Sequence, residues 1–543
     1  MWFWLKARIA DVSSMIDGVE RRKGMASACG WIALTLMAAS FIPDLIVVMD
    51  FSQPYQVAQF SQDEFWFMEE IIELQRYLLA FDVAGIRGFG SPFAYGFPFW
   101  LLTAIVALPF HAHVLLLVLF LRLIFVAMKY VAFYIVYRRV LALTKRPLLS
   151  LLVLVLVLAV PAYVFDGKII GPEYFIMLLV AAGWTALFGA GLAMQAFAAF
   201  CFVLAMVIKI NVIPLGLIFI PVLYAKPKGA RLRLLWAWVA GALLPALLFL
   251  VPDDPFKEIL AINATHRVGY GLEYLSHWYS YNALEFDNML KGGWSVDFID
   301  GAFFAVFFTY AAARAYKWRK EKRRTKNAVI AHGTLILATF FIAVLACFLM
   351  SLNSLMHPWF VFAPFMLLLA AGCLLLGAGY DGTVLMIAFV LVYAVTFGDR
   401  YFARWEHRID KFEYVAATEN ANAEVAKWIS ANCPKAREAV IDYNMLWPVF
   451  YNGHLNRMWT LIEVEDRRRA QADMNEMIDS VDLLLISSLR ANTLLTGANQ
   501  NVAVPGAIFG NFFPDAEPYF TRQQDFAHLS VYARPGVCKK PGK

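Results

Sequence analysis

Residues 50–100 read DFSQPYQVAQFSQDEFWFMEEIIELQRYLLAFDVAGIRGFGSPFAYGFPFW and follow the first long apolar segment of the chain directly. Acidic residues cluster here, among aromatic residues and beside sequence of membrane-spanning length: Asp50, Asp63, Glu64, Glu69, Glu70, Glu73 and Asp82. Charge at the edge of a bilayer is costly, so such a cluster is by default a functional-site hypothesis. We favour that hypothesis for Asp50 and for the Asp63–Glu64 pair. For the three later glutamates we favour the solvated face of an interfacial helix.

The composition predicts a polytopic membrane protein. Of the 543 residues, 61% are hydrophobic and only 16% are charged, whereas about a quarter of the residues of a soluble domain are charged. Apolar runs of about twenty residues recur, which is the length that crosses about 30 Å of hydrocarbon as a helix. The net charge of +6 comes from basic residues in short loops, where they act as topology signals. We therefore expect no nucleic-acid partner.

The basic residues predict the topology. The triplet Arg21-Arg22-Lys23 precedes the first span, at residues 28–49, so residues 1–27 are expected to be an amphipathic cytoplasmic segment. The next apolar run, Phe97–Phe110, is short. If it crossed the membrane, the basic cluster that closes the following span, Val114–Tyr137, would lie outside. We therefore expect a re-entrant or juxtamembrane helix at the outer surface.

With that choice every basic cluster falls on one side of the membrane. We expect an α-helical polytopic membrane protein with about eleven transmembrane helices within residues 28–397, and large external loops at residues 50–113 and 252–299. The remaining spans are predicted at Leu148–Phe165, Tyr174–Leu192, Ala196–Ile210, Pro214–Tyr224, Leu234–Val251, Ala302–Ala315, Val329–Met350, Pro358–Leu376 and Val384–Phe397. The pair around Lys209 is weaker and is broken near that residue.

Residues 398–543 are polar and contain no spanning run. Helix-like and strand-like segments alternate there, which predicts a small external, periplasmic α/β domain. Helices are expected at Ala421–Ser430 and Arg467–Ile478, and strands at Ala439–Asp442, Asp482–Ser487, Val502–Phe509 and His528–Ala533.

The six cysteines fall into two groups. Four lie in or beside apolar spans and are expected to pack there: Cys29, Cys201, Cys347 and Cys373. Cys433 and Cys538 bracket the polar C-terminal region instead. In an oxidising compartment two such cysteines are able to form a disulfide, and we expect that they do.

Polar residues of suggestive type gather on the predicted external side, and these are Asp166, Lys168, Glu173, Lys209, His266, Arg267 and His357. Carboxylates suit a general base or a metal site, and Lys, Arg and His suit a phosphate. Together at one membrane face they fit a reaction on a lipid-borne phosphate. Each also has a plainer interpretation: the lysines snorkel to the interface, the histidines are ordinary loop residues, and Asp166 caps its loop.

Several motifs occur in a characteristic order. An acidic pair in QDEFWF follows the first span, and the aromatic and proline-rich SPFAYGFPFW comes later in the same loop. A span closes on YRRV, a short loop holds Pro172-Glu173 in GKIIGPEYF, a span contains Lys209 in VIKINVIP, and a late turn leads into HPWFVFAP. From about residue 28 to residue 376 this order resembles the GT-C class of membrane glycosyltransferases. The similarity is to the polyprenyl-phosphate-sugar family that includes protein O-mannosyltransferases and aminoarabinose transferases.

The resemblance implies an inverting transfer of one sugar, a hexose or a pentose, from a polyprenyl monophosphate to a glycan, lipid or protein acceptor at the outer face of a bacterial inner membrane. Asp63 would be the general base, and Glu64 or Asp50 would orient the acceptor or help to hold a divalent metal ion. The departing lipid phosphate would be stabilised by Lys168, Lys209, Arg267 and His357. Glu173, Asp166 and His266 would support the acceptor side.

Two departures from the family pattern concern the subfamily and the sugar. Ser91-Pro92-Phe93-Ala94 stands where the family often has Lys-Pro-Pro-Leu, and Pro172-Glu173 stands where it often has Pro-Asp.

Three other functions remain open from the sequence. A transporter or flippase of a lipid-linked or polar solute would show inverted repeats and charges at the membrane midplane, and we find no repeat and place the charges at one face. An O-antigen ligase or polymerase would use a diphosphate-linked glycan. A non-catalytic scaffold with an external sensor domain would leave the acidic loop unexplained.

Overall fold

The computed structural model describes most of residues 11–256 and, later in the chain, residues 424–441, 455, 457–460, 479–487, 519–526 and 529–539. Undescribed positions inside the first range are 12–13, 17, 21, 23, 51, 54–55, 58–61, 91–94, 160–169, 188, 190 and 226–227. The chain divides into two compact units, which we describe separately. The first is Met1–Leu45, Glu70–Pro109 and Leu121–Ala403, and the second is Ile46–Glu69, Phe110–Phe120 and Arg404–Lys543.

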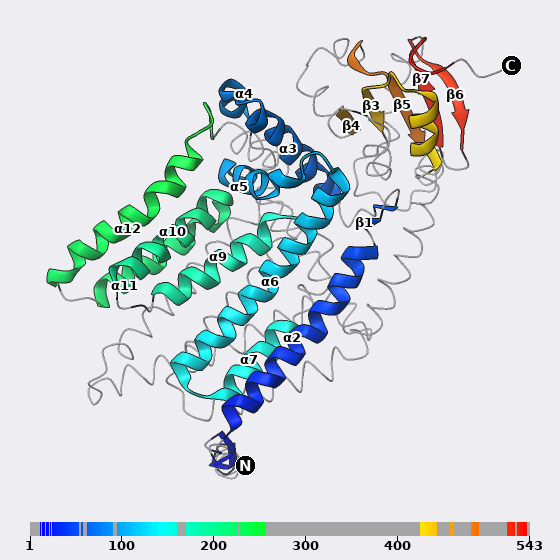
Figure 1. Ribbon diagram of the computed structural model, residues 1–543. Helices are drawn as coiled ribbons and strands as arrows, with labels where there is room; N and C mark the ends of the chain where they lie inside the picture. The colour runs from blue at the N-terminus through cyan, green and yellow to red at the C-terminus, as the bar shows by residue number, and fades with distance from the viewer. Residues whose placement is uncertain are drawn as a thin grey trace, which may run out of the picture. The chain divides into compact units, whose positions relative to one another are not determined.

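Three described helices are long and apolar enough to cross a membrane: α2 (Met25–Asp50), α6 (Val114–Thr144) and α12 (Lys228–Phe249). Their surfaces carry many exposed leucine, isoleucine, valine and tryptophan side chains, as expected of helices that contact lipid. In Figure 1, α2 and α6 run side by side, and α12 runs beside α10 (Leu192–Ile208).

The shorter helices confirm the predicted break near Lys209. α7 (Pro147–Ala159) and α9 (Pro172–Leu187) precede α10, which ends at Ile208. The chain then forms a 3₁₀ helix at Ile210–Ile218, with Pro214 inside it, before α11 at Phe219–Ala225. Proline lacks an N–H and clashes with the preceding turn, so an α-helix does not continue through this segment.

The helices α9, α10 and α12 pack as neighbours, with α10 in the middle. Buried Gln195 of α10 donates to the carbonyls of Leu187 and Gly189, at 2.8 and 2.9 Å, and accepts from the Trp238 indole of α12 at 3.3 Å. A Cβ on Gly241 would lie 1.9 Å from the Ala196 carbonyl oxygen, so only glycine permits this approach of α12 to α10. Small residues and side-chain amides are the usual means of packing helices in lipid.

The loop between the first two spans is mostly helical. It contains a short hairpin of β1 (Ser52–Gln53) with β2 (Gln56–Val57), then α3 (Gln62–Leu79), α4 (Val83–Gly88) and α5 (Phe97–Ala107). A 3₁₀ turn at Leu108–Phe110 follows α5. The eleven residues of α5 span about 16 Å, which is too short for about 30 Å of hydrocarbon. This length agrees with the predicted juxtamembrane or re-entrant helix.

Some predicted boundaries need correction. α6 extends to Thr144, so the basic pair Arg138-Arg139 lies within the helix rather than after it. α12 begins at Lys228 and not at Leu234, so its first two turns hold Lys228, Arg231 and Arg233. The spans predicted after residue 301 lie outside the described residues, as do the helix Arg467–Ile478 and the strand Val502–Phe509.

In the C-terminal region five strands form one mixed sheet in the order β4-β3-β5-β7-β6. They are β3 (Glu438–Ile441), β4 (Arg457–Thr460), β5 (Leu483–Ser487), β6 (Thr521–Asp525) and β7 (Leu529–Ala533). β3 pairs in parallel with β4 and β5, and β7 pairs antiparallel with β5 and β6. Central strands are buried, as Leu483, Leu484 and Leu485 are fully buried on β5. The helix at residues 424–432, yellow in Figure 1, buries Val425, Ala426 and Ile429.

The predicted disulfide is present. Cys433, just after that helix, is bonded to Cys538, which follows β7. Two contacts to the helix end run beside it, because the Lys539 backbone N–H donates to the Asn432 carbonyl at 2.7 Å and its Nζ donates to the Ala431 carbonyl at 2.8 Å. The bridge therefore joins the two ends of the region that holds the sheet, 105 residues apart.

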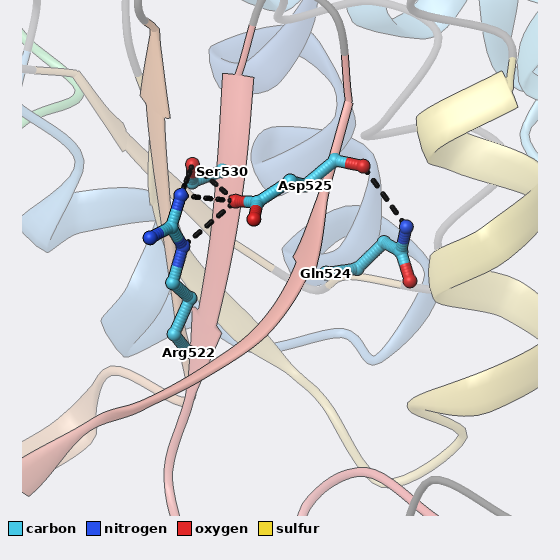
Figure 2. A network of polar contacts seen from close by, with 4 residues as sticks. All are labelled: Arg522, Gln524, Asp525 and Ser530. Carbon is cyan, nitrogen blue, oxygen red and sulfur yellow. Dashed lines mark hydrogen bonds and ion pairs between the residues drawn. The ribbon is translucent and has the colours of Figure 1, made fainter.

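The edge strand β6 carries a polar network, shown in Figure 2. Asp525 Oδ1 accepts from Arg522 Nε and from Ser530 Oγ, both at 2.7 Å, and Arg522 also donates to Ser530 at 3.3 Å. The register of β6 shifts between Arg522 and Gln524. Charged side chains and a bulge are features that discourage an edge strand from pairing with another chain.

The disulfide predicts a thiol count. Of the six cysteines, four should react with a thiol reagent in denatured, unreduced protein, and all six should react after reduction. A disulfide removes two thiols from reaction with the reagent, and reduction of the disulfide restores both. Six reactive thiols before reduction would contradict the bridge, and a Cys433→Ser variant should raise the unreduced count from four thiols to five.

The network on β6 predicts a dependence of stability on pH. The hydrogen bond from Ser530 lowers the pKa of Asp525 below its ordinary value of 3.8, and the hydrogen bond from Arg522 lowers it by a smaller amount. A lowered native pKa contributes stability above the ordinary value, and that contribution is lost as pH falls through the native pKa. Asp525→Asn should therefore lower the unfolding midpoint slightly at about pH 5, and the difference from wild type should shrink as the pH falls below 3.8. A difference that does not change with pH would contradict this assignment.

Candidate functional site

Two residues singled out in the sequence meet in the structure. Glu173, in the first turn of α9, and Lys209, at the C-terminal end of α10, form an ion pair with 3.1 Å between Lys209 Nζ and Glu173 Oε1. Their side chains are only 6% and 10% exposed. Lys209 therefore does not snorkel to the interface, because its ammonium is held inside the protein by a carboxylate. Isolated charges at such a position would be strongly disfavoured, and pairing is what permits their burial.

The aromatic segment before α5 lies directly against Lys209. Tyr95 forms an isolated antiparallel bridge with Lys209, and the Gly96 N–H donates to the Ile208 carbonyl at 2.8 Å. The Lys209 ammonium lies 5.4 Å from the centroid of the Tyr95 ring, which is within the range of a cation–π contact. The external loop thus contributes both backbone and side chain to the surroundings of this lysine.

Gly96 is required for this contact. A Cβ at this position would lie 1.7 Å from the Val207 carbonyl oxygen, so any other residue would push the segment away from α10. The Trp100 indole of α5 donates to the Tyr95 carbonyl at 3.3 Å and fixes the other side of the bridge. The ring centroids of Trp100 and Phe99 are 5.0 Å apart, and Trp100 is fully buried. The N-terminal part of α5 is therefore a packed apolar element beside the bridge.

A second buried ion pair lies among the apolar helices. Lys129 of α6 donates to Asp44 of α2 at 2.6 Å, and the Tyr130 hydroxyl donates to the same carboxylate oxygen at 2.9 Å and to the Ser40 carbonyl at 2.6 Å. Lys129 also lies 5.6 Å from the ring of Tyr174, the residue next to Glu173. Tyr174 therefore connects the neighbourhoods of the two pairs.

The contacts place the Glu173–Lys209 pair at one end of the helices α9, α10 and α12. Glu173 and Tyr174 begin α9, Lys209 ends α10, and Gly96 packs against Phe249, the last residue of α12. Asp44 lies six residues before the end of α2, which is about 9 Å along the helix. We call this the Lys209 end. It agrees with the alternation of span directions predicted from the sequence.

Chemically, the Lys209 end combines buried cations, buried carboxylates and aromatic rings. Lys129 and Arg122, seven residues apart on α6, are both buried, and residues seven apart share one helix face. Charges in a site shielded from water act more strongly on a reacting group than they would in water. Such a site suits a substrate on which negative charge develops, such as a departing phosphate.

The other predicted site residues are only partly visible. Asp50 is the last residue of α2, and Asp63 and Glu64 lie in the first turn of α3. Nothing is described of the side chains of these three acids. Asp166, Lys168, His266, Arg267 and His357 lie outside the described residues. Glu173 and Lys209 are therefore the two predicted site residues that the described structure brings together.

Sequence reasoning missed Asp44, Arg122 and Lys129. All three lie inside predicted spans, at residues 28–49 and Val114–Tyr137, where ionisable residues are rare and usually functional. That rule would have found them. They also correct the expectation that the charges sit only at the membrane face, because Lys129 lies midway along α6.

The possible metal ion remains a prediction. Within the part of the chain that the structure describes, no group of three His, Cys, Asp or Glu residues is arranged to hold a metal. The carboxylates proposed as ligands, Asp50 and Glu64, have no described side chains.

The buried pair predicts a pattern of stability. Glu173→Gln or Lys209→Met alone removes one partner of a buried ion pair, which costs about 3–5 kcal/mol, whereas removal of both charges is close to neutral. In detergent each single variant should therefore unfold at a clearly lower temperature than wild type, and the double variant should recover most of the loss. Single variants that unfold like wild type would contradict a buried, mutually dependent pair.

Comparison with known proteins supports the fold. No protein-family model matches the sequence, and no curated protein sequence matches it significantly. Among solved structures, the chain is similar to ArnT from Cupriavidus metallidurans bound to undecaprenyl phosphate, with 12% identity and a TM-score of 0.50, covering 95% of this chain and 100% of ArnT. The apo form of that ArnT gives a TM-score of 0.47 at 11% identity, covering 93% and 98%.

The oligosaccharyltransferase of Archaeoglobus fulgidus, in complex with zinc and sulfate, gives a TM-score of 0.44 at 11% identity, covering 90% of this chain and 72% of that one. At these identities the similarity concerns the fold. The ArnT match agrees with the apolar helices and with the resemblance found in the sequence. This chain has the helical membrane fold of the GT-C glycosyltransferases.

Proposed function

We propose that this protein is an inverting glycosyltransferase that moves one sugar from a polyprenyl-monophosphate donor to a glycan, lipid or protein acceptor. The observation that carries the proposal is the buried Glu173–Lys209 pair, covered by Tyr95, in a chain with the GT-C fold. Buried ionisable residues in membrane proteins are by default functional. The ArnT structure used for the comparison binds undecaprenyl phosphate, which is a ligand of the proposed donor class.

The proposed reaction needs a base and a stabilised leaving group. Asp63 takes the proton of the acceptor hydroxyl, and the acceptor oxygen attacks the anomeric carbon of the sugar. The bond between that carbon and the phosphate oxygen breaks, and polyprenyl phosphate leaves with the negative charge. Preorganised cations placed where charge develops lower such a barrier.

Lys209 is the described residue best suited to the leaving phosphate. Glu173 holds the lysine ammonium in place, and the Tyr95 ring packs against it. Lys168, Arg267 and His357 remain further candidates on this side of the reaction. Glu64 or Asp50 would orient the acceptor or help to hold a metal ion, and Glu173, Asp166 and His266 would support the acceptor side.

We further propose that the reaction takes place at the outer face of a bacterial inner membrane. The disulfide between Cys433 and Cys538 supports this orientation, because disulfides form and persist in oxidising compartments such as the periplasm. It supports a C-terminal region outside the membrane, which is also the side that the basic clusters of the sequence predict.

A transporter of a lipid-linked or polar solute is the second candidate, and the Asp44–Lys129 pair favours it specifically. An ion pair among apolar helices is also what a transport pathway uses. The two functions differ in their product, because transport leaves the bond between sugar and phosphate intact.

The base assignment gives the main prediction. With purified protein, a panel of polyprenyl-monophosphate sugars and a set of glycan, lipid and protein acceptors, wild type should release polyprenyl phosphate from one donor, and Asp63→Asn should slow that release by about 10²–10⁴-fold, the usual contribution of a general base. Glu70→Gln is the matched control, because it makes the same carboxylate-to-amide change on the same helix, and its rate should stay near that of wild type.

The outcomes separate the candidates. Turnover by Asp63→Asn at the wild-type rate would remove Asp63 from the mechanism. Release only from a diphosphate-linked donor would favour a ligase or polymerase. Movement of the lipid across liposomes without release of polyprenyl phosphate would favour the transporter.

A further inference from the structure

The corner between α3 and α4 displays an unusual phenylalanine. The side chain of Phe81 is 87% exposed, and its backbone has a φ of 53°, in the left-handed region. Its neighbours Leu79 and Val83 are 44% and 65% exposed. Exposure of a large apolar side chain to water is unfavourable. A bulky residue with positive φ is also a genuine outlier. Both disadvantages occur at one position.

The corner is firmly built. The Asp82 N–H donates to the Tyr77 carbonyl at 2.9 Å, and the Asp82 side chain caps α4 by accepting from the Gly85 N–H at 2.9 Å. A Cβ on Gly85 would lie 2.5 Å from the Tyr77 ring, so α4 packs closely on that ring. The Tyr77 hydroxyl donates to Glu73 at 2.6 Å, which raises the pKa of Tyr77 to about 12 and keeps the donor protonated.

Because these contacts fix the backbone, the conformation of Phe81 is part of the fold and not a local rearrangement. Glycine or asparagine would adopt the same φ with less strain and would expose no ring. The folded chain therefore gains nothing visible from a phenylalanine at this corner. Backbone strain of this kind, kept in place by its surroundings, points to a role outside the local fold.

The contacts of α4 with the end of α12 indicate how far the α3–α4 corner lies from the hydrocarbon of the membrane. Arg87 forms an ion pair with Asp253, four residues after α12, and its carbonyl accepts from the Asp253 N–H at 2.9 Å. The 22 residues of α12 span about 33 Å, which matches the hydrocarbon thickness of about 30 Å. Basic residues occupy the first turns of α12, and Asp253 lies beyond its other end.

The exposed leucines of α12 continue to that end. Leu247 and Leu250 are 55% and 59% exposed, so the lipid-facing surface reaches almost to Asp253. With α12 crossing the membrane over this length, Arg87 would lie at the boundary between hydrocarbon and headgroups. The six residues of α4 are about 9 Å long, which is close to the depth of one headgroup layer, roughly 5–8 Å, so Phe81 would lie at most about this far from that boundary.

We propose that the α3–α4 corner inserts Phe81 into the leaflet at the Phe249 end of α12, with Leu79 and Val83 beside it. The occupant of this apolar surface is lipid and not a second protein, because the corner is tied by Arg87 to the end of a helix whose own exposed surface faces lipid. Phenylalanine and leucine on one side with Arg87 near the headgroups is the usual composition of an interfacial anchor. This proposal is independent of the catalytic assignments.

The experiment uses a nitroxide spin label at Phe81→Cys in the full-length protein in liposomes. The collision rates of the label with oxygen, which concentrates in hydrocarbon, and with a nickel chelate, which stays in water, report its depth. The described free cysteines, Cys29 and Cys201, are buried, and labelled wild type gives the background. Tyr519→Cys is the matched control, because it replaces an aromatic residue of the C-terminal region that is 52% exposed.

The label at residue 81 should show an oxygen-to-nickel accessibility ratio several-fold above that at residue 519. A ratio equal to that at residue 519 would overturn the proposal, and so would a label that neither reagent reaches, which would indicate a protein partner. Because Phe81→Cys alters a residue with positive φ, Val83→Cys provides a second site in ordinary helix. It should give the same raised ratio, and a water-like ratio there would likewise count against insertion.

Discussion

The buried ion pair between Glu173 and Lys209 is the contact on which the described membrane unit depends. In the interior of a membrane protein no water is present to solvate an ammonium group, so the group must be paired with an anion. Glu173 begins α9 and Lys209 ends α10, so the pair fixes the level at which these helices meet. The bridge from Tyr95 to Lys209 then places the loop between the first two spans at the same level.

A second pair lies midway along α6, and the two pairs are connected through the ring of Tyr174. Lys129 lies between Asp44 and the ring of Tyr174, whose neighbour is Glu173. One line of contacts therefore runs from α2 through α6 to α9, α10 and the segment before α5. A change at any of these charges would be felt at the others, because each buried charge depends on its partner for stability. Such coupling suits a site that must hold several charged groups while a negatively charged product forms and leaves.

The sequence predicted the features that local patterns encode, and it did not predict the features that depend on how distant residues pack. The first span, the break near Lys209 and the strands around residues 483–487 and 529–533 were predicted, because apolar length, proline and buried runs of leucine are local signals. β6, with the sequence TRQQD, was not predicted, because a strand at the exposed edge of a sheet needs no apolar face. Asp44 and Lys129 were overlooked because a span is recognised by its average hydropathy, which a single charge hardly alters. The pairing of Glu173 with Lys209 joins residues 36 positions apart and depends on how the helices pack, which no local pattern contains.

Gly96 shows why the aromatic motif and the lysine motif belong together. The two backbones approach so closely that the Val207 carbonyl occupies the space of a Cβ at residue 96. This approach brings the Tyr95 ring close to the Lys209 ammonium. Pro98 lies in the first turn of α5, where a backbone N–H would have no acceptor within the helix, so proline is well suited to this position. Tyrosine, glycine and proline each serve a separate geometric need within four residues. The departure from the family pattern at residues 91–94 ends just before this bridge, whereas the second departure supplies Glu173, the ion-pair partner of Lys209.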